Sequence, residues 1–264
     1  MNIAVLISGQ LRDYKVNVQN HLKQLIEPNS CDVFAYVSIK NTIHTIGDNI
    51  TQKYVETTEQ DPDELTSELI SIYGKYLKGF KIMAGEPTSD TFGTVGYFKR
   101  MMHNQMDNIR ECFKMAKEHE KATGIVYDAF IRCRPDNSMF PSPVTLYNRL
   151  EPNRLYTTQY PSGWKDPWFF AFADSDTFDK YCSFDYLPDV DESSTDNNFP
   201  CPEYAIMDYF PRVGIEPEYI PNICRPFYGF NKEEPVEDFP FRDGKEKLIS
   251  SDGELVEQVV NKNG

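Results

Sequence analysis

The amino-acid sequence predicts an α/β fold, in which a mostly parallel central sheet is flanked by helices. Three observations support this class. Short apolar runs rich in β-branched residues indicate buried strands, stretches with helical spacing of apolar residues lie between them, and 40% of the 264 residues are hydrophobic. A chain of this length and composition can bury a full core, which excludes global disorder. It also suits one α/β domain or two small domains.

The first strand is predicted at residues 2–8, where an apolar run ends at Gly9. Apolar residues at helical spacing follow over residues 14–26, and a second apolar strand follows at residues 31–38. This order is a β-α-β unit, which normally gives parallel strands joined by a right-handed crossover. Residues 41–60 are polar and weakly patterned, so we expect a surface loop there.

The next helix is predicted to open at residues 61–64, because proline suits the first turn and carboxylates suit the positive end of the helix dipole. A third strand is expected at residues 79–84. The longest helix is expected at residues 96–121, where one face is apolar. Residues 125–133 then predict a fourth, central strand, which stops at Pro135 because proline cannot donate to a sheet ladder.

The pattern changes beyond Pro141, where the predicted elements are shorter. No internal repeat and no linker divides the chain, so we expect the second half to pack on the first. The expected elements are strands at residues 154–158, 168–173 and 219–221, helices at residues 175–183 and from Pro202, an acidic loop at residues 185–198 and a charged C-terminal tail.

The charge balance narrows the function. A net charge of −14 argues against a nucleic-acid-binding protein, because affinity for phosphate backbones comes mainly from clustered Lys and Arg. No apolar run approaches the roughly 20 residues needed to cross a bilayer, and the N-terminal segment lacks the features of a signal peptide. We therefore expect no membrane span and a cytoplasmic location. The six cysteines are scattered with no C-x-x-C pair, so we expect reduced, buried thiols rather than a zinc or redox site.

Two strand-end loops are candidates for chemistry, because ligands of open parallel sheets bind at the carboxyl ends of the strands. The first loop, Ser8-Gly9-Gln10-Leu11-Arg12, offers backbone N–H groups, a hydroxyl, an amide and a guanidinium, which suit a nucleotide. It lacks the glycine pattern of known phosphate loops. The alternative is a tight turn with Arg12 solvated. If the first and fourth strands are neighbours, the two loops face one crevice.

The second loop, Arg132 to Asn137, places two arginines and Asp136 after an apolar strand. Charged groups in such a place are paired or serve a ligand. A strand-end carboxylate can hold Mg²⁺ or Mn²⁺ against a diphosphate. The alternative is an internal salt bridge between arginine and aspartate.

Several short motifs carry a family resemblance. They are the Ser-Gly-Gln-Leu-Arg loop after the first strand, Asp32-Val33-Phe34, Tyr127-Asp128, and Arg132-x-Arg134-Pro135-Asp136. In order and spacing the chain resembles small nucleotide-sugar-dependent glycosyltransferases of the GT-A fold, which occur in large DNA viruses and microbes. The resemblance implies a hexosyltransferase that takes a nucleoside diphosphate sugar and a glycan acceptor, and that acts in the host cytoplasm if the source is viral.

The resemblance also implies roles for parts of the chain. Within one GT-A-like domain over residues 1–264, residues 1–140 would bind the nucleotide sugar, residues 141–230 would form the acceptor side, and residues 231–264 would be a tail. In GT-A enzymes a D-x-D motif binds the metal and the diphosphate, and here Arg134-Pro135-Asp136 takes its place. Arg134 could itself neutralise diphosphate charge.

The resulting assignments are as follows. Asp136 is the expected ligand of Mn²⁺ or Mg²⁺, and Asp166 and Glu203 are the candidate catalytic carboxylates. The donor-binding residues are expected to be Ser8, Gly9, Gln10, Arg12, Arg100, Arg134 and Asp136.

Other motifs and functions remain as alternatives. A literal D-x-D at Asp174-Ser175-Asp176 precedes a helical stretch, so Asp174 is expected to be an N-cap. Trp164 and Trp168 could pack on a sugar ring or belong to the core, and Glu203 could simply satisfy a helix dipole. The alternative functions are a nucleotidyltransferase, which usually has a glycine-rich basic loop after the first strand, and a non-catalytic sugar-binding protein that keeps the fold.

Overall fold

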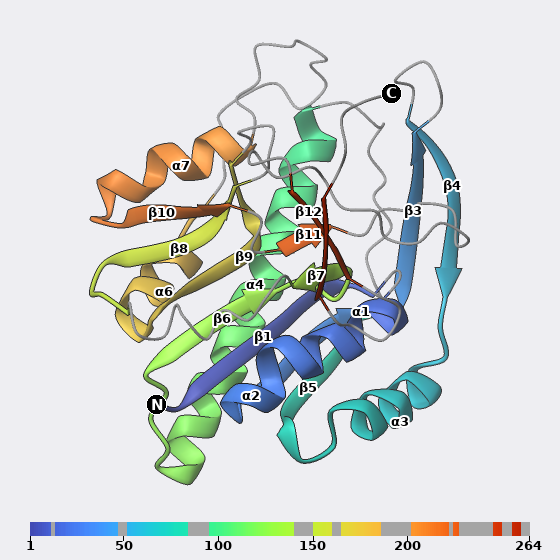
Figure 1. Cartoon of the computed structure of the whole chain (residues 1–264), viewed down its shortest axis with the longest axis horizontal. Helices are drawn as coiled ribbons and strands as arrows, with labels where there is room; N and C mark the ends of the chain where they lie inside the picture. Colours follow the sequence, from blue (N-terminus) through green and yellow to red (C-terminus); the bar gives the residue numbers. More distant parts are fainter. Residues whose placement is uncertain are drawn as a thin grey trace.

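The computed structural model (Figure 1) describes residues 1–11, 14–46, 52–83, 95–139, 150–159, 165–185, 202–221, 224–226, 245–249 and 255–259. Its centre is a seven-stranded sheet in the order β10-β8-β9-β6-β1-β2-β5. The strands are β1 (Ile3–Gln10), β2 (Asp32–Ser38), β5 (Leu77–Met83), β6 (Ala129–Cys133), β8 (Arg154–Gln159), β9 (Lys165–Asp174) and β10 (Glu216–Pro221). All run in the same direction except β9, which is antiparallel to β6 and β8. The predicted α/β class with a mostly parallel sheet is confirmed.

The chain reverses its direction of travel across the sheet at β1. It passes from β1 to β2 and β5, and then returns to the other side of β1 to form β6. The first two crossovers are helical: α1 (Tyr14–His21), the π-helical turn η1 (Leu22–Ile26) and α2 (Glu27–Asn29), then α3 (Pro62–Tyr73) with the 3-10 turn η2 (Gly74–Tyr76). The crossover to β6 is the long helix α4 (Val95–Thr123). The carboxyl ends of β1 and β6 therefore flank a topological switch point.

Helices cover both faces of the sheet, as Figure 1 shows. The side chains of α1, η1 and α3 pack on one face, and α4 packs on the other with α6 (Ser175–Cys182) and α7 (Pro202–Arg212). The helices before and after the reversal at β1 must lie on opposite faces of the sheet, because a right-handed crossover changes face when the chain changes its direction across the sheet.

The apolar run of β1 is explained by burial on both faces. Ile3, Val5 and Ile7 pack in the cluster under α1 and α3, and Ala4 and Leu6 pack in the cluster under α4. Successive side chains of a strand point to opposite faces, so a strand buried on both has no polar alternation.

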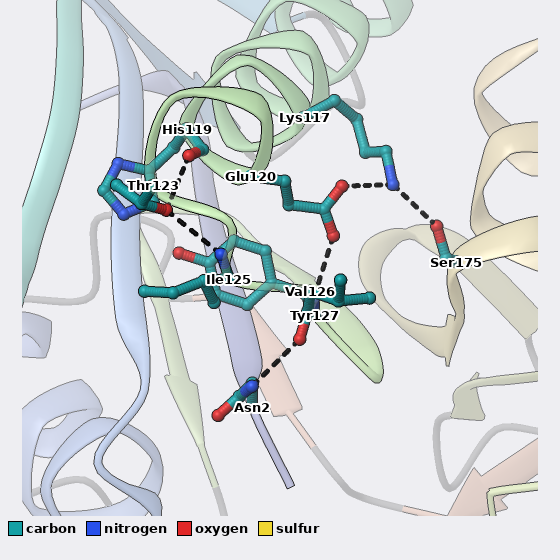
Figure 2. A network of polar contacts seen from close by, with 9 residues as sticks. All are labelled: Asn2, Lys117, His119, Glu120, Thr123, Ile125, Val126, Tyr127 and Ser175. Atoms are coloured by element: carbon teal, nitrogen blue, oxygen red, sulfur yellow. Dashed lines mark hydrogen bonds and ion pairs between the residues drawn. The ribbon is translucent and has the colours of Figure 1, made fainter.

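A network of polar contacts fixes the end of α4 at the amino edge of the sheet (Figure 2). Glu120 Oε1 accepts a hydrogen bond from the backbone N–H of Tyr127 at 2.8 Å, and its other oxygen pairs with Lys117. Lys117 in turn donates to Ser175 Oγ at 3.1 Å. These contacts join α4, the segment before β6 and the first turn of α6.

Three two-stranded sheets complete the described chain. They are β3 (Lys40–Ile46) with β4 (Gln52–Glu59), β7 (Asn137–Met139) with β11 (Cys224–Pro226), and β12 (Lys245–Ile249) with β13 (Leu255–Val259). The loop predicted at residues 41–60 is therefore wrong over most of its length, and the charged tail contains an antiparallel pair. Threonine misled the first prediction, because it is polar yet β-branched and favours extended backbone.

Other expectations hold with shifted boundaries. The fourth strand is central as predicted but begins at Ala129, and the helix expected at residues 96–121 is α4. The described cysteines Cys31, Cys112, Cys133 and Cys182 are reduced and buried, as expected. No helix among the described residues is long and apolar enough to cross a membrane.

Candidate functional site

The two candidate loops meet at the switch point between β1 and β6. The strands are parallel neighbours, with Leu6 opposite Arg132 and Ile7 opposite Cys133, so Ser8 and Gly9 continue beside the loop that follows β6. A Cβ built on Gly9 would lie 4.0 Å from Pro135 Cδ. The structure thus places the described part of the first loop close to the second, as expected if the strands were neighbours.

Gly9 has a conformational reason to be glycine. Its φ is +124°, in a region that L-residues with a side chain rarely adopt. Gly9 is the second-last residue of β1 and still pairs with Val37 of β2, while Ser8 just before it is fully buried and Gln10 just after it is half-buried. The end of β1 therefore places polar residues at the carboxyl edge of the sheet.

The second loop contains a buried ion pair. Arg134 Nε lies 2.8 Å from Asp136 Oδ1 and Arg134 Nη2 lies 2.6 Å from Asp136 Oδ2. The Asp136 side chain has no exposed surface, and the Arg134 side chain is 14% exposed. The guanidinium also lies over the ring of Phe169, with Cζ 4.5 Å from the centroid. Two parallel hydrogen bonds and a stacked ring make this a rigid arrangement.

Residues of α1 hold the backbone that follows this pair. Asn20 donates to the Met139 carbonyl at 3.0 Å and accepts from the Met139 N–H at 2.6 Å. His21 Nε2 lies 2.5 Å from the Asn137 carbonyl, and Asn137 Nδ2 donates to the Phe169 carbonyl at 2.9 Å. The loop is therefore attached both to α1 and to β9.

His21 is fully buried, and this burial lowers its pKa to about 4, although the Asn137 carbonyl and Asp136 oppose the shift. Because a carbonyl only accepts, Nε2 carries the proton and Nδ1 is bare. The sequence placed His21 in a helix without a role. Its only sequence signal is a polar pair, Asn20-His21, at the end of an amphipathic helix, which is common in helices with no such function.

Arg132 is a second buried guanidinium at this edge. It lies opposite Leu6 on the α4 face of β6 and is 1% exposed. Among the described residues, no group accepts a hydrogen bond from its Nε or Nη1, and Ser8 Oγ on β1 has no partner either. Burial lowers the pKa of Arg132, and neighbouring Arg134 lowers it further, while Tyr181 and Asp136 act against this. An arginine nevertheless keeps its proton.

Three other predicted site residues, whose backbone the structure describes, also lie at the carboxyl edge of the sheet. Arg100 lies near the start of α4, which runs back from the carboxyl edge after β5. Asp166 is paired with Thr158 at the carboxyl end of β8, and Glu203 is in the first turn of α7, which precedes β10. The side chains of Asp166 and Glu203 are outside the described part of the structure, as is all of Arg12.

The literal D-x-D motif lies at the opposite edge. Asp174 is paired with Ala129, the first residue of β6. Its Oδ1 accepts from the Thr177 N–H at 2.8 Å and its Oδ2 from Thr177 Oγ1 at 3.0 Å, so it caps α6 as predicted. Trp168 is buried and packs on Phe184, whereas Trp164 lies outside the described residues.

The metal implied at Asp136 does not fit the residues as they stand. A divalent ion needs carboxylate oxygens within metal–oxygen bonding distance. Both oxygens of Asp136 instead accept hydrogen bonds from the Arg134 guanidinium, whose positive charge would repel a cation. Across the described ranges, no cluster of three or more His, Cys, Asp or Glu residues could hold a metal ion. The alternative of an internal salt bridge is what the structure contains.

No protein-family model matches the chain, and no curated protein matches it. Solved structures resemble it at low identity. A protein from Desulfovibrio desulfuricans G20 described as a nucleotide-diphospho-sugar transferase is 13% identical, with 84% of this chain and 80% of that chain covered and a TM-score of 0.43.

Two further solved structures each align with 84% of this chain. A glycosyltransferase involved in the glycosylation of the major capsid of PBCV-1 is 13% identical, is covered over 83% of its chain and gives a TM-score of 0.36. A nucleoside-diphosphate-sugar pyrophosphorylase from Vibrio cholerae RC9 is 10% identical, is covered over 93% of its chain and gives a TM-score of 0.42.

Proposed function

We propose that the protein is a glycosyltransferase that transfers a hexose or deoxyhexose from a nucleoside diphosphate sugar to a hydroxyl of a glycan acceptor. The observation that carries this proposal is the parallel pairing of β1 with β6 at the switch point, which places Gly9 close to Pro135. It joins a loop whose groups suit a nucleotide to a loop whose guanidinium suits a diphosphate. The same two loops carry the sequence resemblance to GT-A glycosyltransferases.

In this proposal the first loop binds the nucleotide and the second binds the diphosphate. Ser8, Gly9 and Gln10, together with Arg12, bind the base, ribose or phosphates of the nucleotide, and Arg134 contacts the diphosphate. Arg100 adds positive charge from α4. Positive charge at this position has a chemical purpose, because the nucleoside diphosphate leaves with the electron pair of the bond to the sugar and gains negative charge as it does so.

The acceptor side is assigned to the segments that begin with Asp166 and Glu203. The acceptor oxygen forms a bond to the anomeric carbon while the bond from that carbon to the diphosphate oxygen breaks. In an inverting transfer one of these carboxylates takes the proton of the acceptor hydroxyl. In a retaining transfer no dedicated base is needed.

The test is to incubate the full chain with UDP-, GDP- and dTDP-sugars and measure release of the nucleoside diphosphate, with and without sugar acceptors. Release of one diphosphate from one donor supports the proposal and names the sugar. Release of pyrophosphate from a nucleoside triphosphate and a sugar phosphate would indicate a nucleotidyltransferase instead. Binding of a sugar without turnover or nucleotide binding would indicate a sugar-binding protein.

Arg154→Gln is the matched control for variants of the site arginines. Arg154 starts β8 at the amino edge of the sheet, pairs with Glu151 and Glu216, and is far along the strands from the switch point. We expect this variant to keep the turnover of the wild type, whereas Arg134→Gln loses most of it. Equal turnover in the two variants would contradict the assigned role of Arg134.

A further inference from the structure

We propose that the site formed by Arg132, Arg134 and Asp136 binds the diphosphate of its donor without a divalent cation, with the two guanidinium groups supplying the positive charge. This inference rests on the proposed function for the identity of the ligand. It departs from the metal-binding role that the sequence resemblance implies for Asp136.

Both carboxylate oxygens of Asp136 face the guanidinium of Arg134. Its two oxygens are 2.8 and 2.6 Å from two different nitrogens of Arg134, so a cation already occupies the bidentate position in front of the carboxylate. A metal ion at the same oxygens would have to displace a guanidinium that also stacks on Phe169. The pair therefore takes the structural place of a metal bound by a carboxylate.

The charge of Arg132 has no ion-paired carboxylate of its own among the described residues. Within that part of the chain, Asp136 is the acidic side chain that acts on Arg132, the other groups being Arg134, Tyr181 and Cys133, and Asp136 is bonded to Arg134. Arg132 is itself buried and only 1% exposed. A buried charge without a counter-ion is costly unless a ligand supplies that counter-ion.

The buried polar atoms of Arg132 and Ser8 complement a ligand that accepts hydrogen bonds. Within the described chain, Arg132 Nε and Nη1 and Ser8 Oγ are buried and form no hydrogen bond. The nitrogens can only donate and the hydroxyl can donate. Leu6 lies opposite Arg132, and Ser8 is two residues further along β1 on the same face. A ligand rich in acceptor oxygens and negative charge, such as a diphosphate, complements this set.

The two arginines would act in different ways. Arg134 has a partly exposed side chain and is the residue that contacts the diphosphate. Arg132 is 1% exposed and offers its charge and its two unpartnered N–H donors in surroundings with little water to screen them. Asp136 orients Arg134 and is a positioning residue.

The principal experiment uses the wild-type chain and isothermal titration with UDP, GDP and inorganic pyrophosphate, in EDTA and then in Mn²⁺. We expect at least one nucleoside diphosphate to bind in EDTA with an affinity within about threefold of that in Mn²⁺. Binding that requires Mn²⁺ overturns the inference and leaves the proposed function standing. If pyrophosphate binds in EDTA but no nucleotide does, the anion site is supported and the proposed function fails. No binding of any probe overturns both.

Two substitutions test the roles of the pair. Arg134→Gln is expected to weaken binding in EDTA by at least about tenfold, because charge-assisted hydrogen bonds are lost. Arg134→Lys keeps the charge beside buried Asp136 and serves if the first variant does not fold. Asp136→Asn is expected to keep or strengthen binding, since asparagine keeps one acceptor oxygen to orient Arg134 while the negative charge is removed. Loss of binding in folded Asp136→Asn, with Arg154→Gln unaffected, contradicts the inference.

Arg132→Met separates a ligand-binding role from a structural one. If the charge of Arg132 serves the ligand, its replacement by an apolar side chain of similar length leaves the melting temperature unchanged or raises it and weakens pyrophosphate binding in EDTA by about tenfold. A structural arginine would show the reverse, with a lower melting temperature and unchanged binding.

Discussion

Stability should depend on pH through His21, the buried residue that holds the loop after Asp136. His21 has no exposed surface, and its Nε2 donates to the Asn137 carbonyl, so a second proton would go onto Nδ1, which has no partner among the described residues. Burial therefore lowers its pKa from 6.5 to about 4. The substitution that tests this is His21→Gln, because glutamine can offer an N–H donor and does not titrate.

The magnitude follows from linkage between proton binding and folding. Between the two pKa values the unfolded chain binds a proton that the folded chain does not, so the free energy of unfolding decreases as the pH falls. At about 1.4 kcal/mol for each pH unit, the full effect is about 3 kcal/mol below pH 4, with about 2 kcal/mol of it lost by pH 5. The contribution is fully present above the unfolded pKa of 6.5.

The assay is urea unfolding of both proteins at about pH 7.5 and about pH 5. Carboxylates titrate in both, so the useful quantity is the difference between them: wild type should lose about 2 kcal/mol more than His21→Gln. NMR of the His21 ring gives an independent measure, since it should stay neutral at pH 5. Equal losses in the two proteins, or a ring that titrates near 6.5, would refute the reasoning.

Three further substitutions are expected to have measurable effects. Gly9→Ala should lower the free energy of unfolding, measured by chemical denaturation, by about 1–3 kcal/mol, because an L-residue is strained at a φ of +124°. The same variant should bind nucleotide more weakly than the wild type in isothermal titration. Glu120→Ala should lower the free energy of unfolding by about 1–3 kcal/mol, because it leaves the part-buried backbone N–H of Tyr127 without its acceptor. Glu120→Gln keeps an acceptor oxygen and should recover part of this loss. Asp174→Ala should lower the free energy of unfolding by about 1 kcal/mol, because the N–H of Thr177 in α6 loses the capping carboxylate. Nucleotide binding should be unchanged. Loss of metal-dependent binding in this variant would instead indicate that the D-x-D motif binds a metal ion.

Local signals in the sequence were sufficient for most elements of the fold. Strand β1 was predictable because an unbroken apolar run has few explanations other than burial on both faces. The start of α3 was predictable because Asp61 can accept hydrogen bonds from the free N–H groups of the first turn, and it does so from Asp63 and Glu64. The β3–β4 pair was missed because its threonines are both polar and β-branched, and only pairing with a partner strand distinguishes these properties.

The candidate site was predictable in position but not in arrangement. The sequence identified the two loops, because polar residues directly follow apolar strands at Ser8 and at Arg134. It left open whether Asp136 holds a metal ion or an arginine. The roles of Asn20 and His21 could not be found, since both depend on contacts with residues more than a hundred positions away.

By itself, the sequence determined which segments form strands and helices, where helices begin, and that charged and polar groups stand at the ends of apolar strands. These properties depend on neighbours within a few residues, through periodicity, capping and backbone preference. Only the tertiary structure decided that β6 pairs with β1, that Gly9 lies close to Pro135, and that Asp136 is bound to Arg134 while Arg132 is buried. Those outcomes depend on which distant surfaces bury one another, and that choice is made by the whole core at once.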